Sequence, residues 1–208
     1  MSIVVHHLNN SRSHRILWLL EELGIDYEIR SYKRDATTNL APPELTKVHP
    51  LGKSPVVEDD ETQIAESGAI IQYLCERHGG DGWLPAPEDE TYVKHLEWMH
   101  FAESSVIVPI MLRLYTSRLG EAAAPLQDRI DSQLADHFAY MDRALDGNGH
   151  FVGHGWTAAD VMLSFPAEIA IMQGMGATYP NLAKFVEAIH ARPAWKRARE
   201  RGGAYFGW

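Results

Sequence analysis

The sequence contains one cysteine, Cys75, among its 208 residues. A single cysteine excludes an intrachain disulfide and a zinc site built from cysteine pairs, and it is typical of proteins from reducing compartments. Basic residues are also few, because 19 Lys and Arg stand against 28 Asp and Glu, for a formal charge of −9. Binding to nucleic acid needs a basic stripe, so we expect no nucleic-acid partner. His6, His7 and His14 lack the spacing of a His-Glu-x-x-His metal motif, so we expect no metal.

Long apolar runs are missing as well. The longest stretch without Asp, Glu, Lys or Arg covers residues 169–183, and it contains Gln173, Pro180 and Asn181. Such a stretch is too short and too polar to cross a bilayer. The N-terminal sequence MSIVVHH lacks the basic start and long apolar core of a signal peptide. We therefore expect a soluble, cytoplasmic protein that does not enter a membrane.

Strand and helix patterns alternate through the first 80 residues. The apolar run 3–8 predicts a strand, and the spacing of apolar residues after it predicts a helix that ends at Gly24. Alternating residues 25–30 predict a second strand, parallel to the first because a helix connects them. Short strands near 56–57 and 63–65 then predict a hairpin, followed by a helix that begins at Ser67. The predicted order is βαβ followed by ββα.

The rest of the chain has helical patterns only. Residues 81–90, DGWLPAPEDE, have the composition of a linker. We therefore predict a first domain over 1–80, this linker, and an all-helical domain over 91–208. The expected helices cover 92–119, with a kink or break at Pro109, and then 126–145, 156–175 and 182–199.

The segment GWTAAD starts one of these helices with a structural motif. Thr157 and Asp160 have the spacing of a capping box, in which each side chain bonds to the backbone N–H of the other residue. We interpret this pair as a folding device and not as part of a catalytic site.

The segment HPLGKSPVV predicts an exposed backbone edge. A residue before proline is held extended, so Ser54 presents its N–H and C=O beside Pro55. If the Ser54–Pro55 bond is cis, both groups project from the sheet toward a ligand. The alternative is an ordinary proline at a sheet edge. Lys53 adds a cation next to this edge, unless it is only a solvated surface lysine.

Glu66 and Ser67 stand where the following helix begins. A helix N-terminus with a serine hydroxyl binds anions, and Glu66 could bind an ammonium group next to it. A carboxylate and an ammonium on one carbon form an α-amino acid group. The alternative is that Ser67 only caps the helix.

Taken together, the segments SRSHRILWLLEELG, HPLGKSPVV, IAESGAIIQYL and GWTAAD resemble the cytosolic glutathione transferase family. The resemblance covers essentially the whole chain and is greatest to bacterial, theta-like members that use a serine. It implies a thioredoxin-like first domain, an all-helical second domain, and glutathione as co-substrate without a metal. It also implies that Glu66 and Ser67 hold the γ-glutamyl group, that the Ser54 backbone before Pro55 pairs with the cysteinyl backbone, and that Lys53 faces the glycine end.

The resemblance assigns the group that stabilises the thiolate of glutathione. Theta-like members place a serine four residues before the arginine of the first helix, which gives Ser11 here, with Asn10 and Arg12 as further candidates. The alternative is that Ser11 or Ser13 only caps the helix. Tyrosine-dependent members carry their tyrosine where this chain has His7 and Leu8. There is no cysteine near residue 10, which disfavours the cysteine-dependent members.

One departure from the theta-like pattern concerns the glycine end of glutathione. Relatives of that type often carry a polar residue about 13 positions before Lys53, where this chain has Leu40. Asn39 is the candidate to replace that residue.

The resemblance also implies the activity, which is the conjugation of glutathione to small hydrophobic electrophiles in detoxification. The electrophile pocket is expected between the domains, although the same residues have the spacing of a helix core; its candidates are Met99, His100, Glu103, Ser104 and Met111. Disulfide or peroxide reduction, dehalogenation and isomerisation are alternative reactions, and a glutathione-binding or assembly module is a non-enzymatic alternative. The family further implies a homodimer, in which the first domain of one subunit meets the helical domain of the other.

Overall fold

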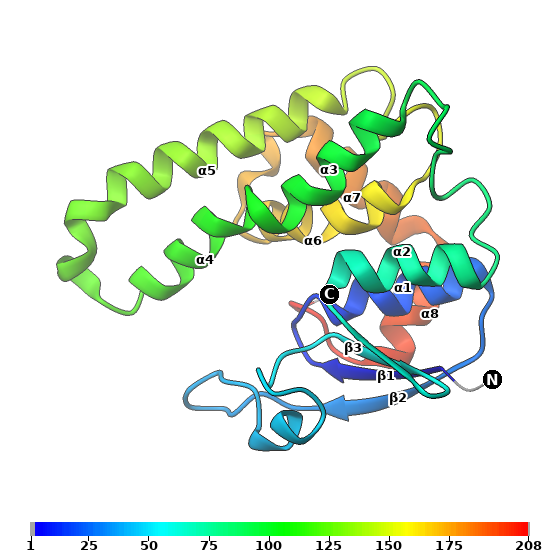
Figure 1. Ribbon diagram of the computed structural model, residues 1–208. Helices are drawn as coiled ribbons and strands as arrows, with labels where there is room; N and C mark the ends of the chain where they lie inside the picture. The colour runs from blue at the N-terminus through cyan, green and yellow to red at the C-terminus, as the bar shows by residue number, and fades with distance from the viewer. Residues whose placement is uncertain (1–2, 208) are drawn as a thin grey trace. The chain divides into compact units, whose positions relative to one another are not determined.

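The computed structural model describes residues 3–207, which form two compact units (Figure 1). One unit contains the residues up to Leu84 together with those from Ile189 on, and the other is Pro85–Ala188. The predicted extents of 1–80, 81–90 and 91–208 stay a prediction. The two compact units have other limits than these predicted domains, because the residues from Ile189 on belong to the same unit as the N-terminal half of the chain. No helix in the described part is long and apolar enough to cross a membrane.

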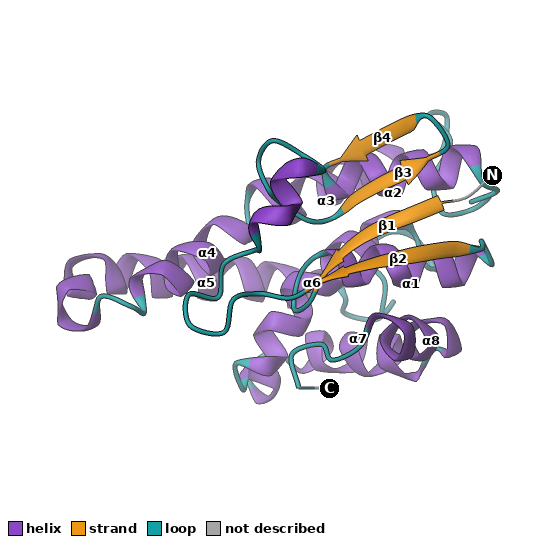
Figure 2. Cartoon of the chain, turned by 90° about the horizontal axis from the view of Figure 1, so that it is seen from below, coloured by secondary structure: helices purple, strands orange, loops and turns teal. Residues whose placement is uncertain are grey.

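The first unit contains a four-stranded sheet with the order β2-β1-β3-β4 (Figure 2). Its strands are β1 (Ile3–Leu8), β2 (Tyr27–Tyr32), β3 (Val56–Asp59) and β4 (Thr62–Ala65). β1 and β2 are parallel, whereas β3 is antiparallel to both β1 and β4. The predicted βαβ and ββα order is therefore confirmed.

Two helices cover one face of this sheet (Figure 1). α1 (Ser13–Leu23) follows β1, and α2 (Ser67–Arg77) follows β4. α1 ends at Gly24 as predicted, since the φ of +66° at this residue is left-handed and favours glycine. A short 3₁₀ helix, η1 (Pro43–Lys47), lies in the long connection from β2 to β3.

The C-terminal helical pattern forms two helices where one was predicted over 182–199. They are α7 (Pro180–Ala191) and α8 (Pro193–Gly202). Arg192 between them is extended, with φ −65° and ψ 133°. The prediction was wrong because Pro193 disfavours a helical conformation at the preceding residue, while it is well suited to the first position of the next helix.

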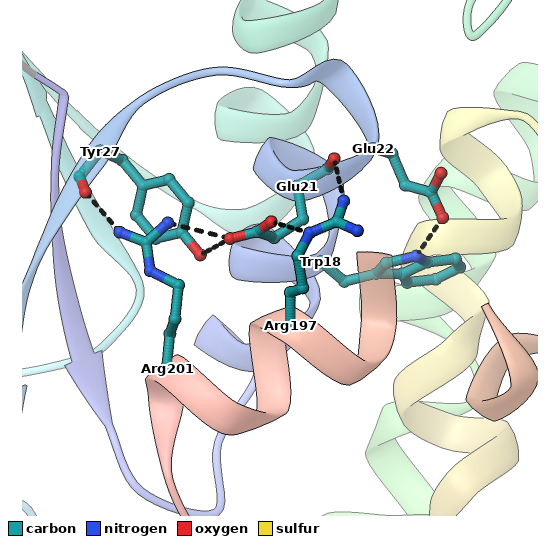
Figure 3. Close-up of polar contacts among 6 residues, drawn as sticks. All are labelled: Trp18, Glu21, Glu22, Tyr27, Arg197 and Arg201. Carbon is teal, nitrogen blue, oxygen red and sulfur yellow. Dashed lines mark hydrogen bonds and ion pairs between the residues drawn. The ribbon is translucent and has the colours of Figure 1, made fainter. Parts of the chain in front are cut away.

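α8 packs against α1 through ion pairs that join the two ends of the chain (Figure 3). Arg197 Nε donates to Glu21 Oε2 at 2.7 Å, and Arg201 Nη1 donates to Glu21 Oε1 at 2.9 Å. Arg201 also donates to the Tyr27 carbonyl at 2.7 Å, and Arg192 pairs with Glu22. Glu21 therefore connects two successive turns of α8 to α1.

The second unit is all-helical, as predicted. It contains α3 (Tyr92–Ser104), α4 (Ile107–Thr116), η2 (Gly120–Ala123), α5 (Ala124–Ala144), α6 (Ala158–Met172), η3 (Met175–Ala177) and most of α7. The predicted helix 92–119 divides at Ser105 and Val106, before Pro109. Pro109 is the third residue of α4, where a missing N–H removes no intrahelical bond. Because proline is tolerated in the first turn of a helix, α4 begins two residues before Pro109, and the break between α3 and α4 comes before Pro109 and not at it.

The predicted capping box at the start of α6 is confirmed. The Thr157 N–H and hydroxyl both donate to Asp160 Oδ2, at 2.8 and 2.9 Å, and the Phe151 N–H donates to Asp160 Oδ1 at 3.0 Å. The carboxyl group is completely buried. Burial raises the pKa of Asp160 from 3.8 to about 6, although the hydrogen bonds act in the opposite direction.

Asp160→Asn should remove a pH dependence from the free energy of unfolding. The folded state binds the Asp160 proton more tightly than the unfolded state, so the wild type loses stability as the pH rises through this window. The loss should amount to roughly 2 to 3 kcal/mol between about pH 4 and pH 7. Urea unfolding of both proteins across this range measures it. A difference between wild type and variant that does not change with pH would contradict this assignment.

Candidate functional site

The register of the sheet brings three loops to the same end of the first unit. His6 pairs with Val56, and Val56 pairs with Ala65 on its other side. β1 ends at Leu8, two residues after His6, while β3 begins at Val56 and β4 ends at Ala65. Residues 9–12, residues 52–55 and the Glu66–Ser67 pair are therefore neighbours, although they lie far apart in the sequence.

The Ser54–Pro55 peptide bond is cis, which is the conformation in which we expected the Ser54 N–H and C=O to project from the sheet. The Ser54 hydroxyl donates to the His6 carbonyl at 2.8 Å and accepts the Leu8 N–H at 3.2 Å. These bonds attach the loop to β1. Among the described residues, nothing bonds to the backbone N–H or C=O of Ser54, which leaves both groups for a ligand.

Glu66 is the residue before α2 and has an unusual backbone, with φ +69°. A positive φ is uncommon in residues other than glycine and is concentrated at functional sites. The Glu66 side chain is exposed, while Ser67 is buried as the first residue of α2. Glu66, and not Ser67, therefore occupies the N-cap position that the capping alternative gave to Ser67.

The loop after β1 holds Ser11 at a nearly buried position, with 5% of its surface exposed. Ser11 Oγ accepts the Ser13 N–H at 3.2 Å and lies 2.8 Å from Ser13 Oγ. Ser11 therefore accepts from the N–H of the first residue of α1, while Arg12 occupies the N-cap position. Asn10 is left-handed, with φ +50°, and its Oδ1 accepts the Phe206 N–H at 2.7 Å.

The hydrogen bonds of this loop continue into the interior through His7. Ser13 Oγ lies 2.8 Å from His7 Nδ1, and His7 Nε2 lies 3.1 Å from the Gly202 carbonyl at the end of α8. His7 and Ser13 are both buried. We predicted no role for His7 from the sequence, because a local pattern cannot indicate its hydrogen bond with Gly202, a residue 195 positions away.

Arg34 is a second residue that the sequence analysis missed. Its guanidinium donates to the backbone carbonyls of Asn9, Asn10 and Asn39, at 3.1, 3.3 and 3.1 Å. The Arg34 N–H also donates to Asn9 Oδ1 at 2.8 Å. Arg34 thus ties the loop that carries Asn10 to the loop that carries Asn39. No motif marks this arginine in the sequence.

The electrostatics of this sheet end favour an anion. α1 and α2 both begin here, and neither has an acidic residue in its first turn. A helix N-terminus carries about half a positive charge. Burial lowers the pKa of Arg34, and the positive charge of Arg12 acts in the same direction. Lys53 adds an exposed cation in the loop before β3.

The glycine-end candidates lie in the loop tied by Arg34. Asn39 is left-handed, with φ +58°, and its carbonyl accepts from Arg34. Leu40 is 63% exposed and offers no polar side chain. Asn39 stays the predicted replacement.

The electrophile-pocket candidates belong to the second unit. Met99, Glu103 and Met111 are half-buried, whereas His100 and Ser104 are exposed. Four of them lie on α3 and Met111 lies on α4, so one continuous helix does not carry them. Their assignment to a pocket stays a prediction.

The single cysteine lies apart from these loops, inside α2. Burial raises the pKa of the Cys75 thiol to about 12. Gly80 packs directly on the cysteine backbone, since a Cβ at residue 80 would come within 2.5 Å of Cys75 Cα. Within residues 3–207, no cluster of His, Cys, Asp and Glu could hold a metal ion.

Comparisons with known proteins agree on one family. Residues 2–76 match the family model described as glutathione S-transferase, N-terminal domain, and residues 107–198 match that of the C-terminal domain. A Schizosaccharomyces pombe protein named glutathione S-transferase 3 is 35% identical, over 96% of this chain and 87% of its own. A solved glutathione S-transferase from Actinobacillus pleuropneumoniae is 34% identical with a TM-score of 0.86, over 98% of this chain and 94% of its own.

A further similarity is to a protein of another kind. A probable elongation factor 1-gamma from Arabidopsis thaliana is 28% identical over 95% of this chain. The match covers 49% of that protein.

Arg34→Met should loosen both loops that its guanidinium connects. Loss of hydrogen bonds to three carbonyls should lower the free energy of local opening by roughly 1 to 3 kcal/mol. Amide hydrogen exchange should therefore become faster in residues 9–11 and 35–40. Lys33→Met is the matched control, because Lys33 is exposed next to Arg34. Equal exchange in the two variants would contradict the role of Arg34.

Proposed function

Because the chain belongs to the glutathione S-transferase family, we propose that it joins the thiolate of glutathione to small hydrophobic electrophiles, with Ser11 as hydrogen-bond donor to the sulfur. The observation that carries this proposal is the meeting of three loops at one sheet end. These loops supply Ser11, the unpaired backbone of Ser54, and Glu66 with Ser67.

The proposed binding mode uses each group according to its chemistry. Glu66 binds the ammonium of the γ-glutamyl group, while Ser67 and the start of α2 bind its carboxylate. The N–H and C=O of Ser54 pair with the cysteinyl backbone, as in a short antiparallel strand. Lys53 and Asn39 face the carboxylate of the glycine end.

The sulfur then lies where β1 meets α1, next to Ser11. A thiol of pKa near 8.5 is only about 3% ionised at pH 7. Lowering that pKa by about two units needs roughly 2.7 kcal/mol of preferential stabilisation of the thiolate. A hydrogen bond to a charged group supplies about 1.5 to 3 kcal/mol, and the N-terminus of α1 adds to it. Asn10 and Arg12 are the further donors in this proposal.

In this proposal the residues that contact the electrophile come from the second unit, and the candidates are Met99, His100, Glu103, Ser104 and Met111. The proposal includes a homodimer. Sedimentation of the purified protein measures that state directly.

Ser11→Ala should lower turnover with a chloronitroaromatic electrophile and leave the affinity for glutathione almost unchanged. Loss of one charge-assisted hydrogen bond should reduce kcat/KM by roughly 10- to 100-fold. Glu66→Gln should have the opposite pattern, a weaker affinity with a smaller change in kcat at saturating glutathione. Steady-state kinetics and calorimetric titration with glutathione separate the two effects.

Matched controls for these variants are Ser132→Ala and Glu61→Gln, since both residues are exposed. Neither control should change kinetics or affinity. Full activity in Ser11→Ala would refute the assignment of the donor and transfer it to Asn10 or a backbone N–H.

A second candidate function is a glutathione-binding or assembly module without turnover. The similarity to elongation factor 1-gamma favours this candidate, because that relative combines a matching segment with a second half of its own. Glutathione-dependent reduction, dehalogenation and isomerisation are further reactions that the same sulfur site supports.

Retention on immobilised glutathione, followed by assays with several electrophiles, disulfides and peroxides, distinguishes these functions. We expect retention together with conjugation. Retention without any turnover would favour the binding module, and turnover of disulfides or peroxides alone would favour a reductase.

A further inference from the structure

A continuous line of buried polar groups leads from Ser11 into the interior of the first unit. Ser11 Oγ and Ser13 Oγ lie 2.8 Å apart, Ser13 Oγ and His7 Nδ1 lie 2.8 Å apart, and His7 Nε2 lies 3.1 Å from the Gly202 carbonyl. The exposed fractions of Ser11, Ser13 and His7 are 5%, 0% and 2%. Only the Ser11 end of the line is next to the proposed position of the sulfur.

The partners of each atom fix where the hydrogens lie. A carbonyl only accepts, so His7 Nε2 carries the hydrogen that it donates to Gly202. His7 Nδ1 of the neutral ring then has a lone pair. The Ser13 hydroxyl has two acceptors within reach, the Leu8 carbonyl at 3.3 Å and this nitrogen at 2.8 Å, and we assign its hydrogen to the shorter contact. The Ser11 hydroxyl donates in turn to Ser13 Oγ. Every hydrogen of the line therefore points inward, and a lone pair of Ser11 remains for an incoming S–H group.

We propose that His7 holds the proton of the glutathione thiol, which reaches it through Ser11 and Ser13. The S–H bond breaks, and its electron pair stays on sulfur. Ser11 Oγ takes that proton and passes its own to Ser13, and Ser13 passes its own to His7 Nδ1, where an N–H bond forms. The Ser11 hydroxyl then points at the thiolate. After the sulfur has reacted, His7 returns the proton through Ser13 to Ser11, and Ser11 gives a proton to a water molecule that has replaced the product, so His7 is restored to its neutral form.

This inference rests on the proposed function, because it needs the sulfur next to Ser11. It adds a destination for the proton. His7 acts through the two serines and does not touch the ligand, so it is a positioning residue.

The surroundings of His7 act on its protonation in two directions. Burial lowers the pKa of His7, which keeps the ring neutral before glutathione binds and opposes its protonation, whereas the hydrogen bond to Gly202 and the charge of a nearby thiolate favour the charged form. The titratable group whose charge interacts with His7 is His14 on α1, and His14 in turn is affected by the charges of His190 on α7 and Arg199 on α8. Burial lowers the pKa of His14 to about 3, so His14 stays neutral.

The last group of this line, the Gly202 carbonyl, belongs to the C-terminal helix α8. A Cβ at Gly202 would lie 2.7 Å from Leu17 Cδ1 and 3.4 Å from His7 Nε2, so a side chain at this position would displace Leu17 and contact His7. The ion pairs of Arg197 and Arg201 with Glu21 hold this end of α8 in place (Figure 3).

The count of protons released when glutathione binds tests the proposal. Calorimetric titration in two buffers of different ionisation enthalpy gives that count, and ultraviolet absorbance of the bound thiolate gives the number of thiolates. At pH 7 the wild type should form thiolate with no net proton release, since His7 retains the proton. Release of one proton per thiolate, or binding wholly as the thiol, would overturn the proposal.

His7→Gln and Ser13→Ala should each interrupt the line. We expect the thiolate fraction at pH 7 to fall about tenfold, which corresponds to a rise of about one unit in the pKa of the bound thiol. The thiolate that still forms should release one proton to the buffer. His154→Gln is the matched control because His154 is exposed, and it should behave as the wild type.

Ser11→Ala, measured in the same way, separates this proposal from the proposed function. If Ser11→Ala lowers the thiolate fraction while His7→Gln and Ser13→Ala do not, Ser11 is the donor and the proton line is wrong. If none of the three variants changes it, the assignment of Ser11 also fails. Thermal unfolding checks that each variant folds. The proton count of the wild type needs no variant, so it decides the proposal even if one variant does not fold.

Discussion

The backbone pairing of β1 with a strand on each side is the constraint on which the candidate site depends. β1 is buried along its whole length, and its register against β3 places the end of β1 next to the cis peptide bond before β3. The register of β3 against β4 then adds the start of α2. A slip of one residue would turn His7 to the other face of the sheet, away from Ser13 and Gly202. Strand pairing therefore specifies the groups that meet at the site.

The C-terminal helix makes the same unit depend on both ends of the chain. Glu21 on α1 binds two arginines of α8, Glu22 binds Arg192 just before α8, and Asn10 accepts the backbone N–H of Phe206. The loop that carries Ser11 is thus bounded by β1, by Arg34 after β2, and by the C-terminal segment. Three parts of the chain, distant in sequence, fix the backbone of one short loop.

Features of the fold whose physical cause lies within a few neighbouring residues could be predicted from the sequence. Gly24 ends a helix because of its own backbone freedom, and Thr157 with Asp160 forms a box within four residues. The early division of the helix at 105–106 and the separate α8 were missed, since apolar spacing continues across both breaks. His7 and Arg34 were missed for another reason. Their partners are backbone carbonyls brought near only by the folded chain, and such partners leave no signal in composition or spacing.

The burial of Cys75 has a consequence for a protein of the glutathione S-transferase family. With a pKa of about 12, only about one Cys75 thiol in 10⁵ is ionised at pH 7, and the thiolate is the form that reacts with electrophiles. Gly80 covers the backbone of this cysteine. Among the described residues, the protein therefore carries no cysteine thiol that would compete with a bound glutathione thiol for an electrophile. The packing of α2 and Gly80 accounts for the low reactivity expected of Cys75.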